Sequence, residues 1–242
     1  MGDLHAGMDS AGLFRPHLGH LAEQADLLLL AGDLTRCGEP AEAEVLASEL
    51  KDVRVPKLAV LGNHDHHADR SPELTRVLEA AGVQVLEGAG TVLELGEVTL
   101  GVAGVKGFGG GFVGACASAF GEPEMKRFVE HTEEIARSLE SALSGLRADR
   151  RVALLHYSPV EETLIGEHPG VYPFLGSYLL AEAVDRAGAD LVVHGHAHRG
   201  SARGVTPGGV PVRNVAQPVL RRAYQVFNLS GRDERVLDPL AG

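Results

Sequence analysis

Residues that could bind metal ions occur in five short clusters of the 242-residue sequence. The clusters are Asp3-Leu4-His5, Gly32-Asp33, Gly62-Asn63-His64-Asp65, His156, and His194-Gly195-His196-Ala197-His198. Imidazole nitrogen and carboxylate oxygen together suit Mn, Fe, Zn, Ni or Co, whereas calcium prefers oxygen alone and structural zinc usually takes thiolates. The clusters therefore predict a transition-metal site and leave the identity of the metal open.

The candidate ligands are too many for a single ion. They are Asp3, His5, Asp33, Asn63, His156, His196 and His198. Two divalent or trivalent transition-metal ions that share a bridging carboxylate fit this set better. Such sites hold their ions about 3.5 to 4 Å apart and stabilise both the attacking and the leaving oxygen of an in-line displacement, commonly at phosphorus. The set therefore indicates a phosphoester hydrolase.

Each cluster also has a simpler interpretation when it is taken alone. Gly32-Asp33 is a common way to end a strand, and Gly62–Asp65 could form a turn in which the Asn and Asp side chains bond to the backbone. The histidines of His194–His198 could bind metal adventitiously, although their alternate spacing after an apolar strand points two rings to one side. His156 alone carries no information, so the interpretation depends on the five clusters together.

The segments around the clusters predict an α/β protein. Strands are expected at Leu27–Ala31, Leu58–Leu61, Val83–Leu86, Thr91–Leu95, Val98–Val102, Val152–Leu155, Leu191–Val193, Val210–Val215 and Ala223–Phe227. Helices are expected at Ala22–Asp26, Glu39–Lys51, Ser71–Gly82, Met125–Leu146 and Tyr178–Arg186, and a glycine-rich loop at Gly107–Gly121. Ligands of open α/β sheets collect at the carboxyl ends of strands, so we expect the clusters to meet at one sheet edge.

The composition agrees with an enzyme of this kind. The sequence is 44% hydrophobic, and with no linker between the clusters we expect one domain over residues 1–242. A formal net charge of -11 disfavours nucleic-acid binding. No run approaches the roughly 18 apolar residues of a membrane span. The two cysteines give no disulfide framework, so a cytoplasmic location is the default expectation.

In this order, Asp-x-His, Gly-Asp, Gly-Asn-His-Asp, His and Gly-His-x-His resemble the motifs of the calcineurin-like metallophosphoesterase superfamily. The resemblance covers residues 3 to 198. It implies a four-layer sandwich of two mixed β-sheets flanked by helices. It also implies that one metal is bound by Asp3, His5 and His198, and the other by Asn63, His156 and His196. Asp33 would bridge the two metals.

The same resemblance implies a mechanism. A hydroxide that bridges the metals would attack phosphorus. His64 would protonate the leaving oxygen as a general acid, and Asp65 would orient the His64 ring. Where the protein Ser/Thr phosphatase branch has Asp-Arg, this chain has Arg36-Cys37. We therefore expect a small phosphodiester or phosphomonoester substrate rather than a phosphoprotein.

Specificity is expected in the loops Gly107–Gly121 and Ser158–Ser177. Aromatic residues that could stack on a substrate, or could simply pack, are Phe108, Phe112, Tyr157, Tyr172 and Phe174. A nuclease, and a non-catalytic interaction module on the same fold, are the alternatives to a small-molecule hydrolase. The sequence does not predict the oligomeric state.

The start of the sequence departs from the family pattern. Relatives have a full apolar strand before the first Asp-x-His motif, whereas only Met1 and Gly2 precede Asp3. We therefore expect a truncated first strand and low stability, because neighbouring strands would keep unpaired backbone groups. The same gap leaves room for an upstream targeting segment.

Overall fold

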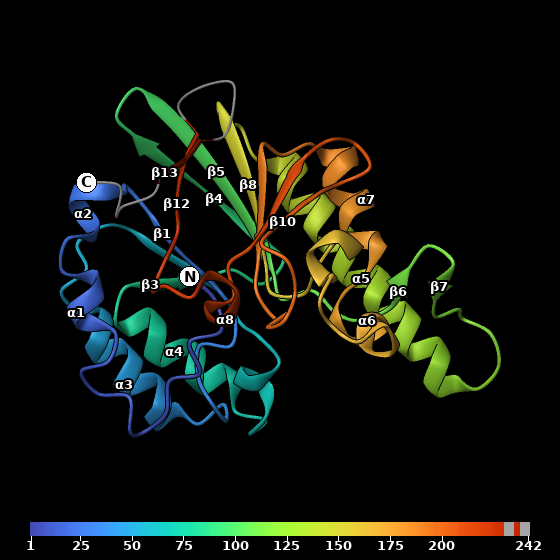
Figure 1. The fold of residues 1–242 in the computed structure, drawn as a ribbon, viewed down its shortest axis with the longest axis horizontal. Coiled ribbons are helices and arrows are strands. Elements are labelled where there is room, and N and C mark those ends of the chain that lie inside the picture. Colours follow the sequence, from blue (N-terminus) through green and yellow to red (C-terminus); the bar gives the residue numbers. More distant parts are fainter. Residues whose placement is uncertain (230–234, 238–242) are drawn as a thin grey trace.

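Two β-sheets packed face to face form the centre of the molecule in the computed structural model, which describes residues 1–229 and 235–237 (Figure 1). The smaller sheet is parallel and has the order β1 (Leu28–Ala31), β2 (Lys57–Val60), β3 (Val83–Val85). The larger sheet has the order β10-β11-β9-β8-β5-β4. Its strands are β4 (Ala89–Leu95), β5 (Val98–Val105), β8 (Arg150–Leu155), β9 (Leu191–His194), β10 (Arg203–Val205) and β11 (Pro211–Asn214).

The larger sheet is mixed. Its four central strands β11, β9, β8 and β5 run parallel, and the edge strands β10 and β4 are antiparallel to their neighbours. The expected architecture of stacked sheets is thus confirmed, with the difference that the smaller sheet is parallel throughout. Since parallel strands end at the same edge, the loops after β5, β8 and β9 emerge together.

The side chains of each strand alternate between two apolar layers. On β8, Val152 and Leu154 face the layer between the sheets, whereas Ala153 and Leu155 face the helices that cover the larger sheet. This two-residue period is the property of extended backbone that lets a strand contribute to two cores at once. Both faces of β8 are therefore buried, which explains why the strand is continuously apolar from Val152 to Leu155.

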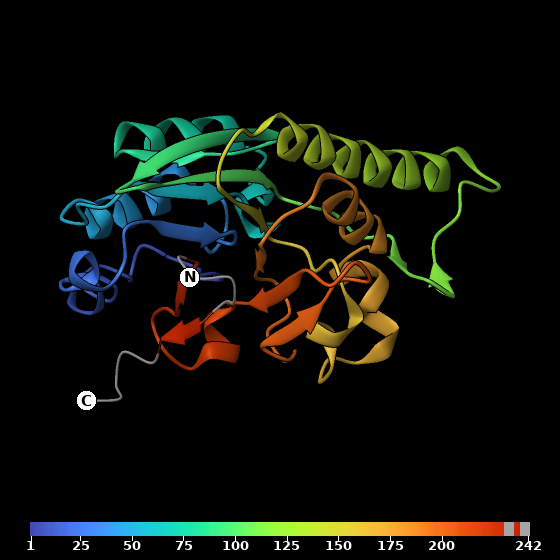
Figure 2. The same ribbon diagram turned by 90° about the horizontal axis from the view of Figure 1, so that it is seen from above.

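Helices form the two outer layers (Figure 2). On the smaller sheet lie α1 (Arg15–Leu18), α2 (Leu21–Gln24), α3 (Pro40–Leu50) and α4 (Ser71–Ala80), whose buried leucines share one core with β1 and β2. The larger sheet is covered by α5 (Pro123–Gly145) and α7 (Tyr178–Ala187). α5 extends beyond the sheet toward the hairpin of β6 (Gly111–Phe112) and β7 (Ala115–Cys116) (Figure 1). This hairpin lies within the segment expected to be a loop.

The C-terminal part of the chain differs from the expectation in one respect. Strand β12 (Val226–Asn228), expected at Ala223–Phe227 to complete the main sheet, pairs instead with β13 (Arg235–Leu237) in a separate ribbon. Short elements that the sequence did not predict include strand β10, α6 (Tyr172–Leu175), α8 (Gln217–Leu220) and three 3₁₀ turns at His64–His66, Glu161–Leu164 and Pro169–Val171. None of the described helices is both long and apolar enough to cross a membrane.

The first residues pair with β1. The N–H of Ala31 donates to the carbonyl of Met1 (2.8 Å), and Gly2 forms an isolated parallel bridge with Ala216. These contacts place Asp3 at the carboxyl end of β1, next to the loop that follows the strand, because the N–H of Asp3 donates to the carbonyl of Gly32 (3.0 Å).

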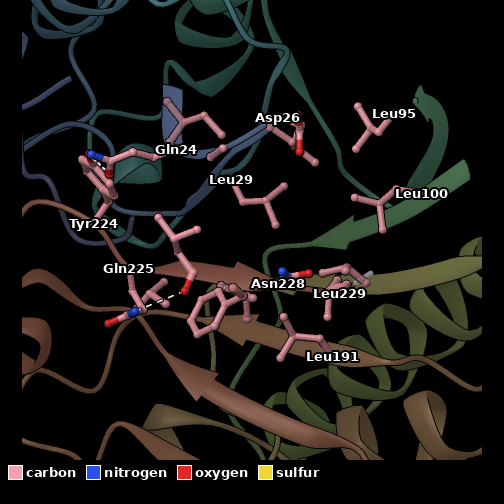
Figure 3. Close-up of a pocket in the computed structure, with 18 of the residues that line it drawn as sticks. Gln24, Asp26, Leu29, Leu95, Leu100, Leu191, Tyr224, Gln225, Asn228 and Leu229 are labelled. Atoms are coloured by element: carbon pink, nitrogen blue, oxygen red, sulfur yellow. Dashed lines mark hydrogen bonds between the residues drawn. The ribbon is translucent and has the colours of Figure 1, made fainter. Parts of the chain in front are cut away.

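A cavity of about 360 Å³ lies between the two sheets (Figure 3). It is lined by Leu29 of β1, Leu100 of β5 and Leu191 of β9, with Tyr224 and Gln225 at its polar side. These leucines belong to the amino-terminal halves of their strands. The candidate metal ligands follow the carboxyl ends of β1, β8 and β9, so the cavity is separate from the candidate metal centre.

Candidate metal centre

The candidate ligands lie together in two groups that share one carboxylate. The first group is Asp3, His5, Asp33 and His198, and the second is Asp33, His156 and His196. Within each group the ligand atoms all lie within 4.8 Å of one another. Six residues from four sequence clusters thus converge at one edge, and Asp33 belongs to both groups, as a bridging ligand would.

The first group is centred on the pair Asp3 and His198. Nε2 of His198 lies 2.9 Å from Oδ1 of Asp3 and 3.4 Å from Nε2 of His5. His5 Nε2 lies 3.8 Å from Oδ2 of Asp33. The carboxylate of Asp3 also accepts two hydrogen bonds from the N–H of His196 (2.9 and 3.0 Å), which joins the first cluster of the sequence to the last.

The second group is centred on His156, which follows β8. Nδ1 of His156 lies 2.9 Å from the carbonyl oxygen of Ala31, which fixes the ring so that Nε2 faces the site. Nε2 lies 3.3 Å from Oδ1 of Asp33 and 3.0 Å from Oδ1 of Asn63, the remaining residue of the predicted ligand set. The ring of His196 lies 4.7 Å from the ring of His156.

Four of the candidate ligands have strained backbone. Asp3 (φ 57°), His5 (φ 45°), Asp33 (φ 48°) and His196 (φ 70°) lie in the left-handed region, where non-glycine residues are uncommon. Each such residue costs about 1–3 kcal/mol, and residues of this kind cluster at functional sites. The left-handed backbone directs these side chains toward one point and lowers the free energy of unfolding.

The glycines of two motifs allow the close approach of the carboxylates. A Cβ on Gly62 would collide with Oδ1 and N of Asp33, and a Cβ on Gly195 would collide with Oδ2 of Asp3. Any larger residue at either position would therefore displace the carboxylate of Asp33 or of Asp3.

The electrostatics of the site fit bound cations. Burial raises the pKa of Asp3 to about 6, and the negative charge of Asp33 nearby also raises it. Burial lowers the pKa of His156 and of His196 to about 3, so both rings are neutral and have free nitrogen lone pairs at neutral pH. Two buried carboxylates close to neutral imidazoles are a costly arrangement unless a cation is present. The donor set and its charge therefore suit divalent metal ions.

His64 lies beside the first group without belonging to either. Its ring centroid is 4.5 Å from that of His5, and its Nδ1 lies 2.7 Å from the carbonyl oxygen of Arg36. The N–H of His64 donates to Oδ1 of Asp33 (2.8 Å). The ring is thus held by a backbone carbonyl, which leaves Nε2 as the nitrogen that could act on a substrate.

Asp65, which we expected to orient His64, makes different contacts. Its carboxylate is fully buried and accepts hydrogen bonds from the N–H groups of Leu34 (3.0 Å), Thr35 (2.8 Å) and Gly62 (2.8 Å), and from Oγ1 of Thr35 (2.6 Å). Asp65 therefore ties the loop after β1 to the loop after β2. The expectation of a direct Asp65–His64 contact is wrong, and Arg36 supplies the contact through its backbone.

Two supporting residues were missed or left undecided by the sequence. His194 is buried at the end of β9, with Nδ1 2.8 Å from the carbonyl oxygen of Gly195 and Nε2 2.9 Å from Oγ1 of Thr163. Lys106 directly follows β5 at the edge where the candidate ligands gather. Lys106 could have been found as the first residue after a strand, like the candidate ligands. It was missed because the strand was expected to end at Val102, whereas β5 ends at Val105.

Comparison with known protein families agrees with this geometry. The model of the calcineurin-like phosphoesterase family, Metallophos, matches residues 1–200. The chain belongs to the calcineurin-like phosphoesterase family. Among curated relatives, the glycerophosphodiester phosphodiesterase GpdQ of Enterobacter lignolyticus (strain SCF1) is 39% identical over 51 residues. That match spans 21% of this chain and 18% of the relative, so it concerns only a small part of either protein.

Two solved structures share the fold of this chain. Phosphopantetheinyl hydrolase (PptH) from Mycobacterium tuberculosis superposes with a TM-score of 0.63 at 17% identity, and the match covers 99% of this chain and 94% of the other. A provisionally assigned 5'-nucleotidase from Staphylococcus aureus superposes with a TM-score of 0.56 at 18% identity, over 98% of this chain and 52% of that one. At these identities the comparison establishes the fold alone.

Proposed function

We propose that this member of the calcineurin-like phosphoesterase family hydrolyses small phosphoesters with two divalent metal ions. The observation that carries the proposal is the membership of Asp33 in both ligand groups. One ion would be held by Asp3, His5 and His198, the other by Asn63, His156 and His196, with Asp33 between them. When bound, such ions supply positive charge for the phosphoryl oxygens and an activated water molecule.

The chain's own residues would hold the site in place. The bond between Nδ1 of His156 and the carbonyl of Ala31 fixes which imidazole nitrogen is free, and the backbone of His196 fixes the carboxylate of Asp3. These contacts lie at the carboxyl ends of β1, β8 and β9. Preorganisation of this kind lowers the cost of bringing several ligands to one ion.

His64 would act on the leaving group. Its Nδ1 contact with the carbonyl of Arg36 requires a proton on Nδ1, so Nε2 carries the second proton only in the cationic form. That form could give the Nε2 proton to the departing oxygen, a role worth about 10²–10⁴ in rate for general acids. Asp65 would act indirectly, because it fixes the loops that hold Asp33 and His64.

Metal analysis followed by two assays tests this proposal. The protein loaded with Mn, Fe, Zn, Ni or Co should bind two ions per chain and should release p-nitrophenol from p-nitrophenyl phosphate or from bis-p-nitrophenyl phosphate. The short match to GpdQ makes the diester a specific second candidate. Two bound ions without hydrolysis of either compound would favour a non-catalytic interaction module, and no bound ions would overturn the proposal.

A further inference from the structure

The loop after β5 brings a lysine beside the second ligand group. The carbonyl oxygen of Lys106 accepts hydrogen bonds from the N–H groups of His156 (3.0 Å) and Tyr157 (3.0 Å). These bonds hold the backbone of Lys106 against the end of β8. His156, the first residue after β8, is the residue whose ring reaches Asp33. The position of Lys106 is therefore set by two neighbouring strands of the larger sheet.

The ammonium group of Lys106 lies over two aromatic rings. Nζ is 5.1 Å from the ring centroid of Phe108 and 5.3 Å from that of Tyr157, within the range of cation–π attraction. The ring of Tyr157 in turn lies 4.3 Å from the ring of His196. A continuous row of rings thus links the ammonium group to a candidate metal ligand.

The ammonium group of Lys106 forms no direct salt bridge with the described residues, although Glu87 lies close to Lys106. The side chain of Lys106 is half-buried. Burial lowers the pKa of Lys106, whereas the charges of Glu87, whose carboxylate lies against the backbone of Lys106, and of Asp33 raise it. A partly desolvated cation of this kind gains more free energy from an anionic ligand than an exposed lysine would.

The field of Lys106 reaches the candidate metal centre. Its positive charge contributes to lowering the pKa of His156 and of His66. Nε2 of His66 is buried and has no hydrogen-bond partner among the described residues. A lysine without a salt bridge and an unsatisfied imidazole nitrogen are therefore both close enough to Asp33 to interact with its charge.

We propose that Lys106, seated on Phe108 and Tyr157, forms an anion subsite that binds the second negative charge of a phosphomonoester. This inference rests on the proposed function of the neighbouring metal centre. A phosphodiester carries one negative charge on its phosphoryl group, whereas a phosphomonoester carries two near neutral pH. Two divalent ions already exceed the charge of Asp3 and Asp33. Lys106 adds one more positive charge, which Glu87 offsets only in part because burial raises the pKa of Glu87 to about 7, so the dianion is the better match.

The test compares two substrates that share a leaving group. In the metal-loaded protein, Lys106→Met should raise KM for p-nitrophenyl phosphate about tenfold, the size expected when one charge-assisted bond is lost. For p-nitrophenyl phenylphosphonate, which has a single negative charge, KM should change less than about twofold. The variant should also weaken the binding of inorganic phosphate measured by calorimetry, while binding of the monoanion dimethyl phosphate stays unchanged.

Two further variants serve as controls. Lys126→Met removes a positive charge from an exposed position on α5 and should leave all four measurements unchanged. Lys106→Arg keeps the charge and should retain part of the preference. If Lys106→Met affected the monoanion and the dianion equally, or neither, the anion subsite would be wrong while the hydrolase proposal stood. If the unaltered protein cleaved neither substrate, the proposed function itself would fail, and the phosphate titration would still test Lys106.

Discussion

Asp3 and His198 are 195 positions apart in the sequence, and yet Oδ1 of Asp3 lies 2.9 Å from Nε2 of His198. Asp3 is buried, whereas the side chain of His198 is 40% exposed, so the pair spans from the interior to the surface of the site. Burial raises the pKa of Asp3 to about 6, and the hydrogen bond with Asp3 raises the pKa of His198. Without a metal ion, the pair therefore takes up protons as the pH falls toward about 6.

This pair predicts that the two metal positions respond differently to acid. An ion at the first position must displace protons from Asp3 and His198, so its affinity should fall as the pH drops below about 7. At the second position His156 and His196, whose pKa values are about 3, remain neutral in mild acid. Dialysis at about pH 5.5 should therefore remove about one of two ions, and at about pH 7.5 both should stay. Simultaneous loss of both ions at one pH would contradict this asymmetry.

Substitutions of the ligands should separate the two ions. Asp33→Asn should lower the affinity for both, because Asp33 belongs to both groups. His156→Gln should lower the affinity for one ion only, since His156 belongs to the second group alone. Metal content per chain after gel filtration measures both effects. Asp52→Asn, at an exposed carboxylate whose side chain is 65% accessible, is the matched control and should keep both ions. Retention of two ions by Asp33→Asn would argue against a bridging role.

The proposed general acid gives a kinetic prediction. His64→Asn should keep the metal content and lower kcat by about 10²–10⁴, because the leaving oxygen would depart without a proton. The effect should be larger for alkyl phosphates, which are poor leaving groups, than for p-nitrophenyl phosphate. The comparison of kcat for the two substrate classes measures this difference. An equal loss on both would argue against the general acid and would point to the contact of the His64 ring with the ring of His5 instead.

The sequence predicted the strands and the sheet edge well because both depend on local patterns. Asp33, Asn63 and His156 follow apolar runs, and the carboxyl ends of parallel strands meet whatever the intervening chain does. The carbonyl of Arg36 that holds His64 could not be predicted, since any residue presents the same backbone group. The left-handed backbone of Asp3 and His5 is also a tertiary effect, because isolated residues of these types favour other conformations.

The end of β5 shows why one important residue was overlooked. The expected strand stopped at Val102 because Ala103 and Gly104 weaken the apolar pattern, whereas β5 continues to Val105. Gly104 suits the packing of the two sheets, since a Cβ there would meet Leu86 (2.7 Å) and Val60 (2.8 Å). Gly104, which interrupts the apolar pattern, is thus required by packing against the smaller sheet. The part of β5 that was not predicted places Lys106 at the site.

The four hydrogen bonds to Asp65 predict a structural role that can be measured. In Asp65→Asn, one oxygen becomes an amide NH2 group. On one side it would leave the N–H groups of Leu34 and Gly62 without an acceptor, and on the other it would leave the N–H of Thr35 without one, because the Thr35 hydroxyl can turn to accept from the amide. We expect the free energy of unfolding to fall by about 3 kcal/mol, the cost of leaving buried donors unsatisfied. Thermal or urea denaturation measures the change, and Asp52→Asn is again the control. An unchanged stability together with a selective loss of kcat would restore a direct catalytic role for Asp65.

The close approach of Gly62 to Asp33 separates metal affinity from folding. In Gly62→Ala the added methyl group would collide with the Asp33 carboxylate and its N–H, so Asp33 must move away from both ligand groups. We expect metal affinity to fall about tenfold or more, as happens when a ligand is displaced from its preferred geometry. Gly19→Ala is the matched control, because its φ is -58° and no atom lies within 4 Å of the added carbon. That variant should bind metal normally and fold at least as stably, since alanine restricts the unfolded chain. If Gly62→Ala bound both ions with unchanged affinity, the close approach of Gly62 would not fix the position of the Asp33 carboxylate. The bridging geometry of Asp33 would then need revision.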